Sequence, residues 1–421
     1  MKTSPAKQRP LEDIHHRIDV ISRRERGRLI AQLVNRLGQH RLQLAEDVAQ
    51  DAIIKALVNW PYHGMPDNPG AWLSTVASNK AIDRLRRENR EQEYDLVADL
   101  RLQSLDEDLV ENPYDPDIEL MLLSCHPALA NIDQLALTLR IVNGFTAREL
   151  ASVFLCTETA MGQRLARAKR KLKTEYVAND DKATSLTEEQ KAAIFKTIYL
   201  MFSLGYAPRT GKQLIRKDIA LEALRLAEQC CNHLQIRNAD AHALCALLYF
   251  QASRLDAREQ SDGKPVLLHQ QNWQLWNREY IQRGFHHLQL SQGGDSLSRY
   301  HVEAAIASLY ANAKSWDGIQ WRQIVVLYSL LQNLTPSPVV TINASVALAM
   351  GGDPATALQT LDDLNDSTVT NTYAPFHIAK AEILTILKRP TEASDSFNRA
   401  IQCGASTPVV EHLEFRLSQL L

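Results

Sequence analysis

The sequence lacks most of the features that mark secreted, membrane-bound or metal-binding proteins. Its 421 residues include six cysteines, and no two of them form a Cys-x-x-Cys pair. This usage is typical of a reducing compartment and predicts neither a disulfide framework nor a metal site. No run of about 18 apolar residues occurs, and the polar N-terminus is unlike a signal peptide, so we expect a cytoplasmic protein without membrane contact.

An excess of charge of one sign is also missing. The chain carries 47 basic and 49 acidic residues, a formal net charge of -2, so any contact with nucleic acid must be confined to local patches. The thirteen histidines are dispersed, and no Ser/His/Asp set or glycine-rich phosphate loop occurs. An enzyme is therefore the least favoured class, and we expect no cofactor and no metal.

The stretch from Gly144 to Lys173 has the pattern of a helix-turn-helix motif. Thr146 is a suitable N-cap for the first helix, Leu155-Cys156 forms the turn, and Thr157 caps the second helix. The second helix has an apolar stripe at helical spacing, made of Met161, Leu165, Ala168 and Leu172. Its other face is polar and basic, with Gln163, Arg164, Arg167, Lys169, Arg170, Lys171 and Lys173. That face could read the major groove, or it could be the solvated side of an ordinary amphipathic hairpin.

Helices with charged faces are also predicted before this motif. Residues 11–38 form the first, and residues 42–60 form a second with an apolar stripe of Leu44, Val48, Ala52 and Leu57. The polar face of the second helix comprises Glu46, Asp47, Gln50, Asp51 and Lys55. It is either solvated surface or a docking surface for a protein partner.

A loop over residues 61–70 is expected next, because it is dense in Pro, Gly, Asp and Asn. Asp67 or Asn68 then introduces a helix that starts near Pro69 and ends in a basic run. Its apolar positions are Trp72, Val76, Ile82 and Leu85. The basic end could bind phosphates beside an unstacked base, or merely complement the helix dipole. Residues 88–117 are acid-rich, which predicts a linker. Residues 118–177 are predicted to form a compact four-helix unit.

These segments together resemble a known family. The phrases AEDVAQDAIIKAL and AWLSTVASNKAIDRLRR, followed by the Gly144–Lys173 motif, resemble regions two and four of a bacterial sigma factor of the extracytoplasmic-function type. The phrases WPYHGMPDNPGAWLSTVA, CHPAL and RLARAKRKLK resemble the subgroup that carries a C-terminal helical-repeat extension.

The resemblance implies three sets of binding residues. Docking on core RNA polymerase would use Asp47, Gln50, Asp51 and Lys55. Melting and reading the -10 element would use the loop at 61–69 with Asn79, Lys80, Asp83, Arg84, Arg86 and Arg87. Reading the -35 element would use Thr157, Thr159, Gln163, Arg164 and Arg167, while Arg170, Lys171 and Lys173 contact the DNA backbone. Ser78 departs from the family, where a basic residue commonly precedes the Asn, and Asp83 is as well placed to orient an arginine as to touch DNA.

The C-terminal half is predicted to be a helical repeat. Helices are expected at 187–206, 218–234 and 239–255, and residues 261–280 as a turn, a short apolar stretch and a helix with two tryptophans. The pairs Pro354/Pro390, Ala357/Ala393 and Leu361/Phe397 are 36 residues apart, and the same step backward reaches Trp321 and Val325. This period is close to that of tetratricopeptide repeats. The extension is either a regulatory module, which could contact the sigma domains, or a structural addition.

The sequence thus predicts an all-α protein with four parts. These are region 2 at 1–95, an acidic linker at 96–117, a region 4 helix-turn-helix at 118–177, and a tetratricopeptide-like extension at 178–421. The favoured function is a sigma factor that binds core RNA polymerase and directs promoter recognition, melting and transcription initiation. The alternatives are a conventional helix-turn-helix regulator with a protein-interaction repeat domain, or a repeat scaffold with a degenerate DNA-binding head. A conventional regulator has no need for the polar face at 46–55 or the basic helix before residue 90.

Overall fold

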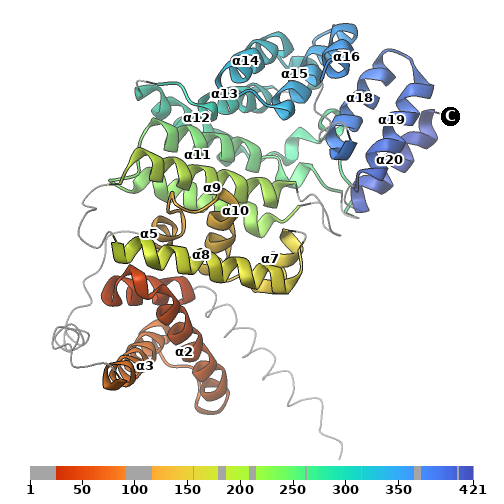
Figure 1. Cartoon of the computed structure of the whole chain (residues 1–421). Helices are drawn as coiled ribbons and strands as arrows, with labels where there is room; N and C mark the ends of the chain where they lie inside the picture. Colours follow the sequence, from red (N-terminus) through yellow and green to blue (C-terminus); the bar gives the residue numbers. More distant parts are fainter. Residues whose placement is uncertain are drawn as a thin grey trace, which may run out of the picture. The chain divides into compact units, whose positions relative to one another are not determined.

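The computed structural model describes residues 25–91, 116–154, 156–178, 186–207, 215–260, 263–294, 296–313, 315–364, 371–404 and 407–420. Within these ranges every regular element is a helix, apart from one isolated bridge between Glu259 and Pro265, so the predicted all-α class is confirmed. The chain forms two compact units, residues 1–197 and 198–421 (Figure 1). None of the helices in the described ranges is long and apolar enough to cross a membrane.

The first unit opens with helical residues 25–37, followed by the 3-10 turn η1 (Gln39–Arg41) and two long helices, α2 (Leu42–His63) and α3 (Pro69–Glu91). Residues 1–24, which include the start of the helix predicted at 11–38, lie outside the described residues. Small buried residues such as Ala52 and Ala77 let α2 and α3 pack closely, and Trp60 and Trp72 meet edge to face at a centroid distance of 5.3 Å.

Two details of α2 differ from the prediction. The loop predicted over 61–70 is shorter, because Pro61 lies inside α2 and the helix ends at His63, with Gly64 at the C-cap in a conformation of φ 83°. A proline in the last turn forfeits only one hydrogen bond, so the helix can continue past it. Leu57 is 37% exposed and does not belong to the buried stripe. Because it follows Ala52 by five residues, it lies about 140° around the helix.

The second part of the first unit is the predicted four-helix group, α5 (Pro116–Ser124), α6 (Asn131–Ile141), α7 (Ala147–Val153) and α8 (Glu158–Ala178). Thr146 caps α7 in a capping box with Glu149, and the Thr157 hydroxyl accepts the Ala160 N–H at 3.2 Å at the start of α8. The predicted inner stripe of α8 is buried, with Met161 fully enclosed. The helix-turn-helix is therefore confirmed, although Leu155 of its predicted turn lies outside the described residues.

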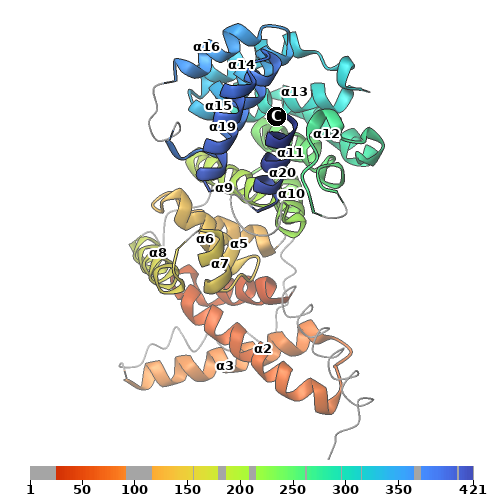
Figure 2. The ribbon, with the colours of Figure 1, turned by 90° about the vertical axis from the view of Figure 1, so that its right-hand side faces the viewer.

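Helices of the second unit begin inside α9 (Glu188–Tyr206) and continue with α10 (Lys217–Asn232), α11 (Ala239–Ala252), α12 (Arg278–Leu290) and α13 (Arg299–Asn312). Helix α11 packs against α10, α12 and α13 (Figure 2). Nearly all of its side chains are buried. Short 3-10 turns connect the helices of this unit: η2 (Leu255–Ala257), η3 (Leu268–Gln270), η4 (Trp273–Leu275), η5 (Ser291–Gly293) and η6 (Trp316–Gly318).

The predicted helix with two tryptophans is wrong in its boundary. Trp273 and Trp276 precede α12 and stack on each other at a centroid distance of 4.4 Å. The Asn277 side chain accepts the Tyr280 N–H at 3.0 Å and so caps α12 after both tryptophans.

The 36-residue repeat is confirmed over two helix pairs. Among the described residues the further helices are α14 (Trp321–Leu334), α15 (Pro338–Met350), α16 (Pro354–Asp362), α18 (Ala374–Ile386), α19 (Pro390–Gln402) and α20 (Thr407–Leu420). Ala357 and Ala393 are fully buried at equivalent positions. The same 36-residue step back from Ala357 predicts a buried residue at Trp321, and this is wrong by three residues. Trp321 is only half-buried, whereas Ile324, the fourth residue of α14 as Ala357 is of α16, is fully buried. Helices α13 and α14 therefore form a packed pair like the two later ones, but they do not follow the 36-residue period.

Candidate nucleic-acid interface

Helix α8 presents most of the predicted -35 residues on one exposed face. Thr159, Gln163, Arg167 and Arg170 are exposed and recur at spacings of three and four residues, which places them on the same side of the helix. Thr157 and Lys173 are exposed at the beginning and near the end of that helix. A row of this kind is long enough to meet both base edges and phosphates.

Two members of the predicted set lie at the edge of that face. Arg164 is half-buried, with its Nε 3.8 Å from a carboxylate oxygen of Asp133 on α6, and Lys171 donates to the backbone carbonyl of Ala128. A partly exposed ion pair contributes only about 0–1 kcal/mol, so Arg164 can exchange Asp133 for a DNA partner at little cost.

The predicted -10 residues on α3 likewise fall into an exposed group and a half-buried group. Asn79, Asp83, Arg86 and Arg87 are exposed. Lys80 and Arg84 are half-buried and turn toward α2, where they meet the acidic residues that were predicted to dock on polymerase.

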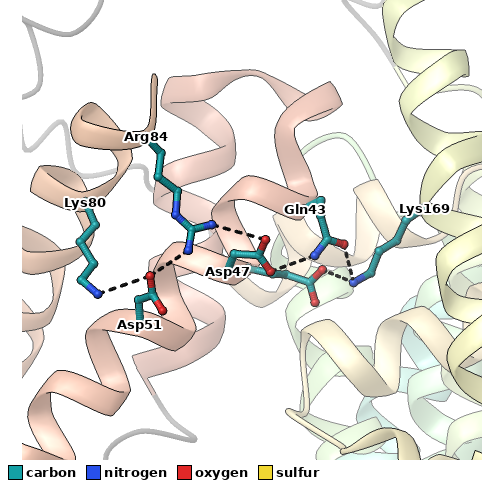
Figure 3. A network of polar contacts seen from close by, with 7 residues as sticks. Gln43, Asp47, Asp51, Lys80, Arg84 and Lys169 are labelled. Carbon is teal, nitrogen blue, oxygen red and sulfur yellow. Dashed lines mark hydrogen bonds and ion pairs between the residues drawn. The ribbon is translucent and has the colours of Figure 1, made fainter. Parts of the chain in front are cut away.

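This contact joins two residue sets that the sequence had assigned to separate partners. The Asp51 carboxylate lies 2.9 Å from Arg84 and 3.3 Å from Lys80, and Asp47 lies 3.5 Å from Arg84 (Figure 3). Gln50 and Lys55 of the predicted docking set are exposed. The acids therefore orient two basic side chains of α3 and lower the net positive charge around them.

Exposed apolar residues on α2 extend the predicted docking set. Ile54 and Val58 are 48% and 59% exposed and continue the series begun by Asp47 and Asp51 along one side of the helix. The polar pattern of 46–55 drew attention to the charged members only. Helical spacing alone, applied to the apolar residues that follow, would have placed these two on the same face.

A second polar contact links α2 to the predicted DNA-reading helix. Lys169 of α8 forms an ion pair with Glu46 of α2 and donates to Gln43 at 3.1 Å (Figure 3). The Glu46 side chain is only 5% exposed, and Arg26 lies 3.8 Å away on its other side. Glu46 was expected on a solvated or protein-docking face, and Lys169 on a solvated or DNA-reading face. Both expectations are wrong, because tertiary packing turns the two side chains toward each other.

Arg26 strengthens the same junction. It donates to the backbone carbonyl of Arg140 at 3.0 Å, and Arg140 in turn donates at 2.8 Å to the carbonyl of Phe145, which lies just before α7. Burial lowers the pKa of Arg26, with a smaller lowering from Arg140, while Glu46 opposes the shift. The helix-turn-helix is thus anchored to the N-terminal helices by charge-assisted contacts.

Comparisons with known proteins agree with this arrangement. Residues 23–91 match the family model for Sigma-70 region 2, residues 119–172 match Sigma-70, region 4, and residues 190–292 match a Family of unknown function (DUF6596). An uncharacterized protein of Rhizobium meliloti (strain 1021) is 35% identical over 385 residues, which cover 90% of each chain. No solved structure matches the chain significantly.

The two matched regions and the basic faces of α3 and α8 define a DNA-binding transcription initiation factor that recognises promoters. Sigma-70 domains act together with RNA polymerase and are not enzymes. The chain belongs to the sigma-70 family, as a factor like those of the extracytoplasmic-function type with a C-terminal extension.

Proposed function

We propose that this sigma factor docks on core RNA polymerase through α2, melts and reads the -10 element with α3 and the loop before it, and reads the -35 element with α8. The observation that carries the proposal is the exposed series on α2, which combines acidic and apolar side chains beside two basic helices. Ile54 and Val58 lie one helical turn apart in line with Asp47 and Asp51, and adjacent exposed apolar side chains bordered by polar ones are typical of interaction surfaces.

The docking step fits the composition of protein interfaces. Their centres are apolar and their rims polar, and the α2 face offers two aliphatic side chains with carboxylates at one end. Asp47 and Asp51 already pair with α3, so we propose that they hold the rim in place, while Ile54 and Val58 supply the buried contact.

Val58 allows a matched test of docking. Val58 and Val177 are 59% and 60% exposed, and each lies on a helix of the first unit. Val58→Glu should abolish co-purification with core RNA polymerase, because a carboxylate would be forced into an apolar contact, whereas Val177→Glu should leave it intact. Equal binding by both variants would move the docking surface away from α2.

Reading of the -10 element is proposed for the exposed residues of α3. A flipped base costs a few kcal/mol of unstacking, which contacts to a captured base can offset without nucleotide hydrolysis. Asn79→Ala should reduce melting, measured by the fluorescence of 2-aminopurine placed in the -10 element, while leaving polymerase binding unchanged. Normal melting by this variant would assign base capture to other residues.

Promoter geometry requires the contact between α2 and α8 to open. The -10 and -35 elements lie about 25 base pairs apart, roughly 85 Å along the DNA axis. In the first unit, by contrast, Lys169 of α8 touches Glu46 of α2. We propose that this contact belongs to the free factor and breaks when both promoter elements are bound.

A modulating role is proposed for the C-terminal helical region. The support is architectural, since helical repeats commonly present surfaces for partners. A chain that ends at Ala178, the last residue of α8, tests it by run-off transcription with core polymerase. Altered activity at unchanged solubility is expected, whereas unchanged activity would reduce the extension to a structural addition.

A further inference from the structure

Three helices of the second unit bring together sulfur and nitrogen ligands that are dispersed in the sequence. Cys231 lies at the end of α10, Cys245 in the middle of α11 and His287 near the end of α12. The candidate ligand atoms of these three residues all lie within 4.8 Å of one another. His242, one helical turn before Cys245, completes what we call the Cys/His cluster, with its Nδ1 3.0 Å from the Nδ1 of His287.

The cluster is enclosed by the helices that form it. Cys245 is fully buried, and Cys231 and His287 are 6% and 9% exposed, while His242 is half-buried. The two cysteines are free thiols. Helices α10 and α12 both pack against α11. A small apolar residue at each position would fill such a core without the cost of burying two imidazoles.

We propose that the Cys/His cluster binds one Zn²⁺ ion through two sulfur and two nitrogen ligands. Two thiolates and two imidazoles are a donor set that zinc prefers, and they form a closed tetrahedral site of the structural kind. With Zn–S bonds of about 2.3 Å and Zn–N bonds of about 2.0–2.1 Å, neighbouring ligand atoms of a tetrahedron are about 3.6 Å apart. The ligand atoms of Cys231, Cys245 and His287 therefore need to approach one another by only about 1 Å, and the two imidazole nitrogens, now 3.0 Å apart, need to separate slightly. Side-chain rotation can supply both movements.

Charge balance favours a dication over other occupants of this core. Zinc binding displaces the two thiol protons to solvent, and the two thiolates, with two neutral imidazoles, then balance the +2 charge of the ion. A neutral site can be buried without a further counter-ion.

Surrounding groups hold the imidazole of His287 in position. The Tyr249 ring stacks on it at a centroid distance of 5.7 Å, and the Tyr249 hydroxyl accepts from Arg283 at 3.1 Å. Arg283 also donates to Glu228 on α10 at 3.1 Å. Such outer contacts orient the ligands of protein metal sites and tune their affinity.

The proposal gives a chemical property to the segment that matches a family of unknown function. All four ligands fall within residues 190–292, so the ion would tie α10, α11 and α12 into one body. It does not depend on the sigma-factor function, because the ligands lie outside regions 2 and 4.

Cobalt binding by the full-length, reduced protein tests the site. We expect one Co²⁺ per chain, with the thiolate charge-transfer and ligand-field absorption of a tetrahedral dithiolate site, and displacement of Co²⁺ by Zn²⁺. Zinc should also protect Cys231 and Cys245 from alkylation, which mass spectrometry of the unmutated chain measures directly. Absence of tetrahedral Co²⁺ binding, or full alkylation in the presence of stoichiometric Zn²⁺, would overturn the proposal.

Variants locate the ligands. Cys245→Ser should remove the charge-transfer band, and His242→Gln should weaken zinc affinity about tenfold or more. Cys125→Ser is the control, because Cys125 is a buried thiol of the first unit and should leave Co²⁺ binding unchanged. Retention of the full dithiolate spectrum by Cys245→Ser would place the metal elsewhere. Recovery of a stable Cys231–Cys245 disulfide whose reduced form binds no metal would replace the zinc site with a redox pair.

Discussion

The ion pair between Lys169 and Glu46 makes a quantitative prediction about the free sigma factor. Their side chains are 16% and 5% exposed, so both charges are largely removed from water. Removing one partner of a buried pair commonly costs about 3–5 kcal/mol. Arg26 lies 3.8 Å from Glu46 and would compensate part of the loss, so we expect a coupling energy of about 1–3 kcal/mol.

The perturbation is a double-mutant cycle with Glu46→Gln, Lys169→Met and the double variant. Amide hydrogen exchange of peptides from α2 and α8 reports the free energy of local opening at both sides of the contact. Each single variant should lower that free energy, and the double variant should lower it by less than the sum. Additive effects within about 0.5 kcal/mol would show that the two side chains are not energetically coupled.

A functional consequence follows for the same variants. Glu46→Gln weakens the contact between α2 and α8 without removing a basic residue from the DNA-reading face of α8. We assume here that the contact between α2 and α8 competes with binding to polymerase and promoter. Every 1.4 kcal/mol removed from the free energy of that contact should then raise the apparent affinity for core polymerase and promoter about tenfold, until most free molecules already lack the contact. An unchanged affinity, together with a measured coupling above about 1 kcal/mol, would refute the idea that the contact must open for function.

Arg167→Ala should relax selection at the -35 element in run-off transcription, whereas Lys173→Ala should weaken binding to all sequences alike; the same profile from both would contradict base reading by α8. Lys388→Gly should raise the free energy of unfolding by up to about 1 kcal/mol, because Lys388 adopts a φ of 57° where the preceding repeat has Gly352, and an unchanged or lower thermal midpoint would argue against strain there. His126 accepts the Ala128 N–H at 3.2 Å, and burial lowers the pKa of its imidazole. As the pH falls, the unfolded state therefore binds the proton before the folded state does. The contribution of neutral His126 to the free energy of unfolding is present above about pH 6.5 and is lost below it. The thermal midpoint should therefore drop between pH 7.5 and 5.5, and less steeply in His126→Gln.

Periodic local patterns were sufficient to predict most of the helices. The apolar stripe of α8 and the capping by Thr146 and Thr157 are local features, so the helix-turn-helix could be found from spacing and residue type alone. The repeat could be seen in the sequence because Pro354 and Pro390 begin equivalent helices, and these helices bury alanines at equivalent positions. Wrong boundaries arose where local signals conflict, as at Pro61, which ended the predicted helix three residues too early.

Contacts between distant segments could not be predicted in the same way. Glu46 and Lys169 each have the appearance of a solvated charge, and only packing of α8 against α2 buries them together. The same reason hides the Cys/His cluster, because Cys231 and Cys245 are supplied by different helices and have no short ligand spacing. A sequence without a metal motif can therefore fold into a metal-binding geometry.

The register of the two terminal helix pairs has an evolutionary consequence. Helices α15 and α18 begin at Pro338 and Ala374, and their partners α16 and α19 begin at equivalent prolines, so the two pairs coincide after a shift of one period. Each pair contacts mainly its neighbours, as in other repeat proteins. Duplication or deletion of one whole period at this boundary would leave every remaining helix beside a partner of the same kind. The C-terminal array is thus the part of the gene where length can change in complete steps while the promoter-binding half stays untouched.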